Sequence, residues 1–299
     1  MVGGAPRERD DAIQGVADEL TRGSGPLSRE LAGRMALLSP FFLLYGVLLA
    51  WPLASMVRQS LLDGLTQYVR VVRNPLFRLA MTNTLVISAV TTACALVLGY
   101  LCAAAIWRSS GVVRVVVLAL VLLPFWTGVL VKNFAWAVLL HDHGIINGLL
   151  RDLGLIRQPL PLLHNRFAVI VGMVHFVLPY AVFPILAAMS GIDDRLERAA
   201  QSLGASRFEA SRLVVFPLTL PGVYAAALLV FIVCTGFFIT PVLLGGPKDM
   251  MAANLVEYYA RQLVDFQAAS AVAVLIVAGV SVLVAVYERL PKEGQFGRL

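Results

Sequence analysis

Few residues in this sequence have the type and spacing that bond chemistry requires. The three cysteines, Cys94, Cys102 and Cys234, fall in apolar runs with no C-x-x-C pair, so we interpret them as packing residues rather than disulfide or metal sites. His141 and His143 lie in a polar stretch, and the apolar runs contain no metal-spaced pair of histidines. The sequence therefore does not predict an enzyme, whether soluble or intramembrane.

The clearest ionisable candidates within or near the end of the apolar runs are His175 and Lys132. A charge is costly there, so such residues are functional candidates by default. For His175, a neutral ring hydrogen-bonded to a neighbouring helix is the simpler interpretation, and contact with a solute is the alternative. The apolar runs themselves contain no Asp or Glu that would pair with either residue.

Binding of nucleotides or nucleic acids is not predicted either. The sequence contains no G-x-x-x-x-G-K-[ST] phosphate loop. Its net charge is +6, but the Lys and Arg residues occupy short segments between apolar runs, where they act as topology and headgroup anchors. They form no basic stripe with interleaved aromatic residues.

The composition predicts an all-α membrane protein. Of the 299 residues, 59% are hydrophobic and 14% are charged, whereas soluble domains contain about 45–50% apolar and about 25% charged residues. A water-soluble globule cannot bury that much apolar surface. Lipid accepts it, because a helix of roughly 20 apolar residues crosses about 30 Å of hydrocarbon.

Six apolar runs are long enough to predict six transmembrane helices. They are Met35–Val57, Asn83–Trp107, Val112–Leu130, Phe167–Met189, Gly222–Leu244 and Ala268–Tyr287. Prolines within several of these runs are tolerated in membrane bundles, where neighbouring groups satisfy the freed carbonyls. A seventh run, Asn133–Leu140, is too short to span and is predicted to be a helix at the membrane face.

These runs divide the chain into a cytoplasmic N-terminal tail (residues 1–34), a transmembrane domain (residues 35–290) and a C-terminal tail (residues 291–299). The mixed charges of the first tail do not suit a cleaved secretory signal. With a cytoplasmic N-terminus, about 14 Lys and Arg residues lie inside and about 10 outside, a weak bias in the usual direction.

The connection between the fourth and fifth runs, residues 190–217, has the sequence signals of two short helices. Asp193 or Asp194 can cap the first helix, and Gly204 supplies a left-handed stop. Four residues at helical spacing form its apolar face: Leu196, Ala199, Ala200 and Leu203.

The second of these helices starts at a capping box. Ser206 and Glu209 have the required spacing, and Pro217 is predicted to end or kink the helix that follows. Small residues on an exposed apolar face suit docking into a groove of another protein. The alternative is an amphipathic hairpin that rests on the membrane surface.

Residues 199–217 resemble the EAA loop of binding-protein-dependent ABC importer permeases, whose pattern is E-A-A-x3-G-x9-I-x-L-P. The positions in register are Ala199, Ala200, Gly204 and Pro217. The chain departs from the pattern where Arg198 replaces Glu, with Glu197 displaced by one position, and where Val214 and Phe216 replace Ile and Leu. Segments 144–147, 159–168, 217–222 and 240–247 further resemble the spermidine/putrescine subgroup, so the resemblance covers most of residues 35–290.

This resemblance implies a type I ABC importer permease-like bundle in the bacterial inner membrane, with loop 190–217 as a cytoplasmic coupling helix. The implied partners are two ATPase subunits that use ATP and Mg, a second homologous permease in a heterodimer, and a periplasmic solute-binding protein. No cofactor is expected on this chain itself. The implied ATPase-coupling residues are Glu197, Arg198, Ala199, Ala200, Gly204, Ala205 and Pro217.

The implied solute is a polyamine such as spermidine or putrescine, or a related small amino compound. Such a cation favours carboxylates and aromatic faces, which gives these candidates for the pathway: Trp126, Phe134, Trp136, His175, Tyr180, Asp142, Glu257 and Asp265. A permease for amino acids, phosphonates or anions stays open. An ion-coupled carrier is a further alternative, although its paired interrupted helices and intramembrane carboxylates are not evident.

Overall fold

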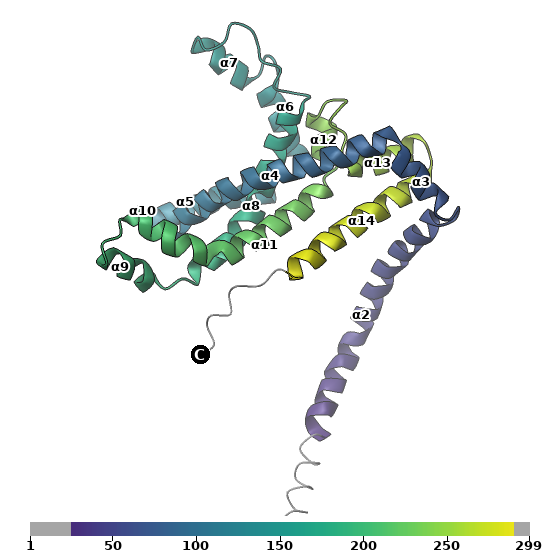
Figure 1. Ribbon diagram of the computed structural model, residues 1–299, viewed down its shortest axis with the longest axis horizontal. Helices are drawn as coiled ribbons and strands as arrows, with labels where there is room; N and C mark the ends of the chain where they lie inside the picture. Colours follow the sequence, from purple (N-terminus) through teal and green to yellow (C-terminus); the bar gives the residue numbers. More distant parts are fainter. Residues whose placement is uncertain (1–24, 290–299) are drawn as a thin grey trace, which may run out of the picture. The chain divides into compact units, whose positions relative to one another are not determined.

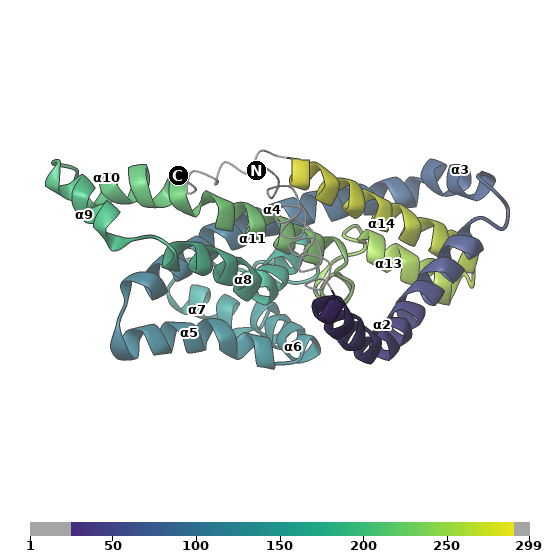
Figure 2. The ribbon, with the colours of Figure 1, turned by 90° about the horizontal axis from the view of Figure 1, so that it is seen from below.

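The computed structural model describes residues 25–289, which contain helices and no strand (Figures 1 and 2). The chain divides between Arg58 and Gln59 into two compact units. The described part of the first unit is a single helix, α2 (Gly25–Ser60), whose last two residues belong to the second unit. Most of the predicted N-terminal tail and all of the predicted C-terminal tail, residues 291–299, lie outside the described residues.

The second unit contains the remaining helices, and its long helices are joined by shorter ones. In chain order they are α3 (Thr66–Arg73), α4 (Pro75–Arg108), α5 (Gly111–Trp126), α6 (Val129–Leu140), α7 (Ile145–Asp152), α8 (Arg166–Ser190), α9 (Asp194–Ser202), α10 (Arg207–Ala210), the π-helical turn η1 (Ser211–Val215), α11 (Phe216–Thr235), α12 (Ile239–Leu244), α13 (Ala252–Glu257), the π-helical turn η2 (Tyr258–Gln262) and α14 (Phe266–Arg289).

Helices α4, α8 and α11 pack against one another and form the centre of this unit (Figure 1). Small residues let the helix backbones approach closely, as is usual in membrane bundles. A Cβ added at Gly99 of α4 would lie 2.7 Å from the Cβ of Ala181 in α8. A Cβ added at Gly222 of α11 would lie 2.5 Å from the Cβ of Ala188, also in α8.

The apolar pattern of the described helices confirms the all-α membrane class. Five helical segments are long and apolar enough to cross a membrane, and there are six if the bent pair of α5 with α6 and α7 counts as one span. Large apolar side chains on the outer faces of the long helices, such as Val97 and Leu101 on α4, are exposed. Exposed apolar side chains of this kind suit contact with lipid.

The third predicted run, Val112–Leu130, is not one straight helix. Helix α5 ends at Trp126 and α6 begins at Val129, and the helical segments on the two sides of this break are bent by 105°. Pro124 removes a hydrogen-bond donor from the last turn of α5, and Gly128 then adopts an extended conformation, with φ −58° and ψ 143°, before α6 begins. The predicted short helix Asn133–Leu140 is the later part of α6.

The fifth predicted run, Gly222–Leu244, is wrong at both ends. One continuous helical segment extends from Arg207 to Thr235 and includes α10, η1 and α11, whereas α12 is separate. Of the two predicted effects of Pro217, to end or to kink the helix, the first is wrong, because the segment continues through it. The π-helical turn η1 directly precedes it, and this wider turn makes room for a ring that would clash with a regular α-helical turn.

Candidate functional site

The loop between α8 and α10 forms the first of the two predicted short helices. Helix α9 begins after Asp193, whose Oδ1 accepts a hydrogen bond of 2.8 Å from the backbone N–H of Arg195. It ends at Ser202, and Gly204 then adopts a left-handed φ of 95°. Glycine adopts this conformation without the steric cost that other residues incur. The predicted cap and the predicted stop are therefore confirmed.

The capping box that starts the second helix is also confirmed. The N–H of Ser206 donates to Oε2 of Glu209 at 2.8 Å, and the N–H of Glu209 donates to Oγ of Ser206 at 3.3 Å. Two free N–H groups at the start of α10 are satisfied in this way. The box fixes the point at which the chain leaves the loop and enters the long segment Arg207–Thr235.

The apolar face of α9 is directed away from the bundle. Leu203 is 90% exposed and Leu196 is 48% exposed. Ala199 is exposed and Ala200 is half-buried. We call these four residues the coupling face. Figure 2 shows α9 and α10 at the opposite end of α4 from α3, so the coupling face lies at one end of the second unit.

An ion pair joins α9 to the end of α4. Nη2 of Arg108 lies 3.4 Å from Oε1 of Glu197. Both residues line a pocket of about 340 Å³ together with Arg198, Gln201 and Arg207. Glu197, which is displaced by one position from the glutamate of the EAA pattern, thus forms an ion pair within the chain. Arg198 stands at the position that the glutamate has in that pattern.

The structure places three of the predicted pathway residues on α6 and α8, and two of them are in direct contact. Nε1 of Trp136 donates to Nδ1 of His175 at 3.0 Å. Tyr180 lies five residues further along α8, and its ring centroid is 5.8 Å from that of Phe125. Because Nδ1 of His175 accepts a hydrogen bond, that nitrogen carries no proton and the ring is neutral, in agreement with the simpler interpretation of this residue.

The other predicted pathway residues are not part of this group. Trp126 is 84% exposed and Phe134 is 60% exposed. Glu257 ends α13, and Asp265 accepts a 2.9 Å hydrogen bond at Oδ1 from the N–H of Ala268 at the start of α14. Asp142 is exposed between α6 and α7. The eight candidates therefore do not form a single binding site.

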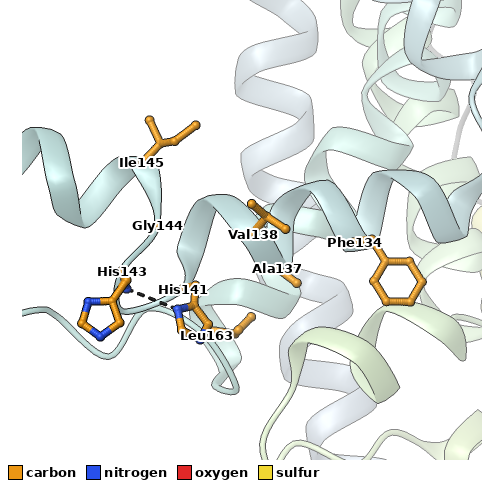
Figure 3. A pocket seen from close by; sticks show the side chains of 8 residues that line it. All are labelled: Phe134, Ala137, Val138, His141, His143, Gly144, Ile145 and Leu163. Atoms are coloured by element: carbon orange, nitrogen blue, oxygen red, sulfur yellow. Dashed lines mark hydrogen bonds between the residues drawn. The ribbon is translucent and has the colours of Figure 1, made fainter.

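A second pocket, of about 370 Å³, lies where α6 meets α7 (Figure 3). Its lining is mainly apolar and contains two imidazoles, and the backbone N–H of His143 donates to Nδ1 of His141 at 3.2 Å. The lining residues are Phe134, Ala137, Val138, His141, His143, Gly144, Ile145 and Leu163. Asp142, the predicted acid nearby, is not among them, so this pocket offers no carboxylate to a cation.

Residues 95–291 match the family described as the binding-protein-dependent transport system inner membrane component. This range includes the whole loop 190–217 and the aromatic group formed by Trp136, His175 and Tyr180. The chain belongs to this family. The permease is 34% identical over 219 residues to the spermidine/putrescine transport system permease protein PotB of Haemophilus influenzae. The matched residues cover 73% of this chain and 77% of that protein. Escherichia coli PotB is 32% identical over 222 residues, with 74% and 80% covered.

Solved structures support the fold of the permease. A chain from the crystal structure of a bacterial alginate ABC transporter, in complex with an alginate pentasaccharide-bound periplasmic protein, superposes with a TM-score of 0.73. It is 19% identical, and the match covers 87% of the permease and 94% of that chain. A chain from an amino acid ABC transporter gives a TM-score of 0.52 at 19% identity. These similarities show the shared fold alone.

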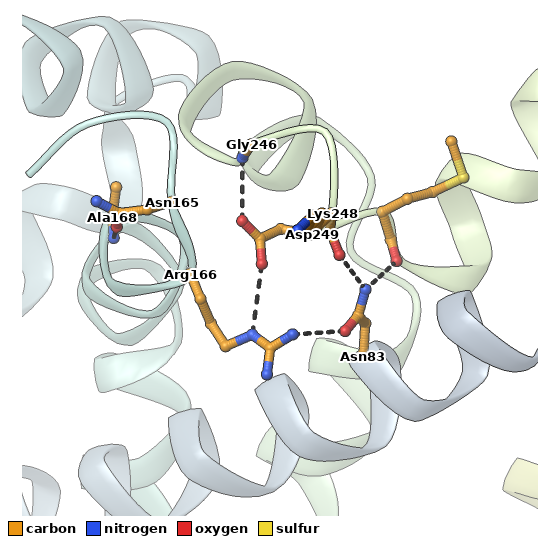
Figure 4. Close-up of polar contacts among 8 residues, drawn as sticks. Asn83, Asn165, Arg166, Ala168, Gly246, Lys248 and Asp249 are labelled. Atoms are coloured by element: carbon orange, nitrogen blue, oxygen red, sulfur yellow. Dashed lines mark hydrogen bonds and ion pairs between the residues drawn. The ribbon is translucent and has the colours of Figure 1, made fainter. Parts of the chain in front are cut away.

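One polar cluster of the permease was missed by the sequence analysis (Figure 4). Nη2 of Arg166, the first residue of α8, donates to Oδ1 of Asn83 at 2.6 Å, and Nε lies 3.4 Å from Oδ1 of Asp249. Asn83 donates to the carbonyl oxygens of Lys248 and Met250 at 2.7 and 3.0 Å. The cluster ties the loop after α12 to α4 and to the start of α8. Because its members are distant in sequence, no local pattern indicated it.

Proposed function

We propose that this chain is the membrane-spanning permease subunit of an ATP-driven importer for polyamines such as spermidine or putrescine. The similarity to two PotB proteins over about three quarters of the chain carries this proposal. Both relatives are spermidine/putrescine permeases by name. The aromatic group of α6 and α8 supports the same solute class, because ring faces attract organic cations.

In this proposal the coupling face docks onto a cytoplasmic ATPase subunit. The exposed leucines Leu196 and Leu203 enter a groove on the ATPase, and Glu197, Arg198 and Ala205 contact its rim. The ATPase subunits bind ATP and Mg, and this chain binds neither. Movement of the ATPase pair is passed through α9 to the long helices, which exchange inward and outward access of the pathway.

The proposed assembly contains a second, homologous permease and a periplasmic binding protein that selects the solute. The N-terminus of this chain and loop 190–217 then face the cytoplasm. Single cysteines introduced at Ser202 and Asp142, in a chain whose own cysteines are replaced, test this sidedness. We expect a membrane-impermeant maleimide to label position 142 from outside and position 202 after the inner face is opened. Labelling of position 202 from outside would contradict the proposal.

Uptake measurements test the function itself. The permease is co-expressed with the ATPase, the second permease and the binding protein of its operon, and the complex is reconstituted into liposomes. We expect ATP-dependent uptake of labelled spermidine or putrescine, and no uptake when the ATPase carries an inactivated phosphate loop. Uptake of an amino acid, a phosphonate or another anion in place of polyamines would reject the proposed solute class. Uptake that persists without ATP would indicate an ion-coupled carrier.

A further inference from the structure

Lys132 of α6 is a buried lysine with an unusual set of contacts. It is 9% exposed. Its Nζ donates a 2.6 Å hydrogen bond to the carbonyl oxygen of Pro124 and lies 4.6 Å from the centroid of the Phe176 ring. The two ion pairs found among residues 25–289 involve other side chains. A carbonyl group and an aromatic face therefore hold this ammonium group in place of a carboxylate.

The break between α5 and α6 creates the carbonyl part of this site. Because α5 ends at Trp126, the carbonyl oxygens of its last turn lack partners within the helix. The Pro124 oxygen accepts hydrogen bonds from the side chains of Thr127, at 3.0 Å, and Lys132. The C-terminal end of a helix also carries a partial negative charge, which favours a cation at this position.

Aromatic rings extend the site beyond the ammonium group. The Phe176 ring stacks on Tyr180, with 6.1 Å between centroids, and meets Phe237 edge to face at 4.8 Å. Tyr180 in turn contacts Phe125 of α5. The rings come from α5, α8 and the segment between α11 and α12, so they form a wall rather than an isolated contact.

The neighbouring imidazole adds no positive charge to this site. His175 precedes Phe176, and its Nδ1 accepts the indole N–H of Trp136. An imidazolium ion would have a proton on that nitrogen and could not accept this bond. Lys132 is therefore the cation that the Pro124 carbonyl oxygen and the Phe176 ring contact.

We propose that Lys132 occupies an alkylammonium-binding subsite of the transport pathway, and that a primary ammonium group of the solute replaces it there during transport. A lysine side chain ends in a primary ammonium on a four-carbon stem. One end of putrescine has the same primary ammonium on a chain of four carbons. The recognition of an alkylammonium rests on the contacts above. The identity of the solute that replaces Lys132 rests on the proposed function.

Thermal stability of the purified complex in nanodiscs tests the subsite without a transport assay. Lys132→Ala removes the lysine ammonium and leaves the subsite formed by the Pro124 carbonyl oxygen and the Phe176 ring unoccupied. We expect added n-butylammonium to raise the melting temperature of this variant and to leave the wild type unchanged. Neutral n-butanol, which has nearly the same shape, should have no such effect. The additional change Phe176→Leu should abolish the effect of n-butylammonium, whereas the matched change Phe167→Leu, at an exposed position of α8, should preserve it.

Binding of labelled putrescine to the complex without its binding protein gives a second measurement. Lys132→Met keeps the volume and removes the charge, so putrescine should bind about tenfold more tightly than to the wild type. Lys132→Arg keeps the competing cation and should bind as weakly as the wild type. This measurement also covers the case in which the alanine variant does not assemble.

Three outcomes would overturn the subsite: equal stabilisation by butanol, persistence of the butylammonium effect after Phe176→Leu, or unchanged putrescine affinity in Lys132→Met. A wild-type complex that imports no polyamine, together with a positive butylammonium result, would reject the proposed solute and leave the subsite standing. The two proposals can therefore fail independently.

Discussion

Arg108 and Glu197 are 89 residues apart in the sequence and form an ion pair of 3.4 Å between the end of α4 and α9. Their side chains are 50% and 19% exposed, respectively. A pair this accessible to water contributes only about 0–1 kcal/mol to stability. The pair connects the loop that carries Leu196 and Leu203 directly to a central helix of the bundle.

We expect Arg108→Gln and Glu197→Gln each to leave the melting temperature nearly unchanged and to lower solute uptake per ATP hydrolysed by the complex. The double change Arg108→Glu with Glu197→Arg should restore much of the coupling, because the pair is re-formed with opposite polarity. Glu288→Gln, at an exposed position of α14, is the matched control. Equal coupling in all of these variants would show that the ion pair has no part in transmission.

Gly204 is predicted to tolerate no aspartate. Its φ of 95° is strained for residues other than glycine, at a cost of about 1–3 kcal/mol, and the new carboxylate lies beside the coupling face. We expect Gly204→Asp to uncouple ATP hydrolysis from uptake or to prevent the ATPase from co-purifying. Gly191→Ala is the control, since Gly191 has a φ of −84° and an added Cβ would meet the Ala188 oxygen at an ordinary 3.6 Å. Full uptake by the aspartate variant would refute this assignment.

The close contact of α8 and α11 makes Gly222 sensitive to size. We expect Gly222→Val to separate these helices and to destabilise the permease by about 1–3 kcal/mol, as overpacking typically does. Gly279→Val in α14 is the comparison, because a Cβ at Gly279 has open space within 4 Å. Thermal unfolding of the solubilised protein measures both variants. Equal losses of stability would mean that helix propensity, and not packing, determines the effect.

Asn83 holds the loop that contains Lys248, a trypsin site. Asn83→Leu leaves two carbonyl groups and the Arg166 guanidinium without this partner, at a cost of roughly 1–3 kcal/mol. We expect faster tryptic cleavage after Lys248 in this variant. Asn83→Asp retains an acceptor for Arg166 and loses the two donated hydrogen bonds, so its cleavage rate should be intermediate. Unchanged proteolysis in both variants would show that other contacts hold the loop.

Local sequence signals predicted the helix caps and the stop of loop 190–217 well. The cap at Asp193, the left-handed Gly204 and the Ser206–Glu209 box each act over at most a few residues, so their sequence context determines them. The apolar runs likewise predicted the helical class, because the length of hydrocarbon that a span must cross is fixed.

Contacts between distant segments could not be predicted in the same way. The Arg166–Asn83 hydrogen bond joins residues 83 positions apart, and the packing of α4 on α8 determines it. The break before α6 was hidden because the apolar run continues through Gly128, and hydropathy does not detect a change of direction. The π-helical turn that accommodates Pro217 also left no compositional trace.

The segment Arg207–Thr235 contains 29 residues and passes from the loop through the bundle without a break. At about 1.5 Å per residue, its two ends are roughly 42 Å apart. The interruptions of regular hydrogen bonding, at η1, Pro217 and Pro221, all lie at or before Pro221, so a tilt of the regular helix that follows is not absorbed by a hinge within the segment. Such a tilt must reappear at Gly236 as a sideways displacement, next to the Phe237 ring that packs on Phe176.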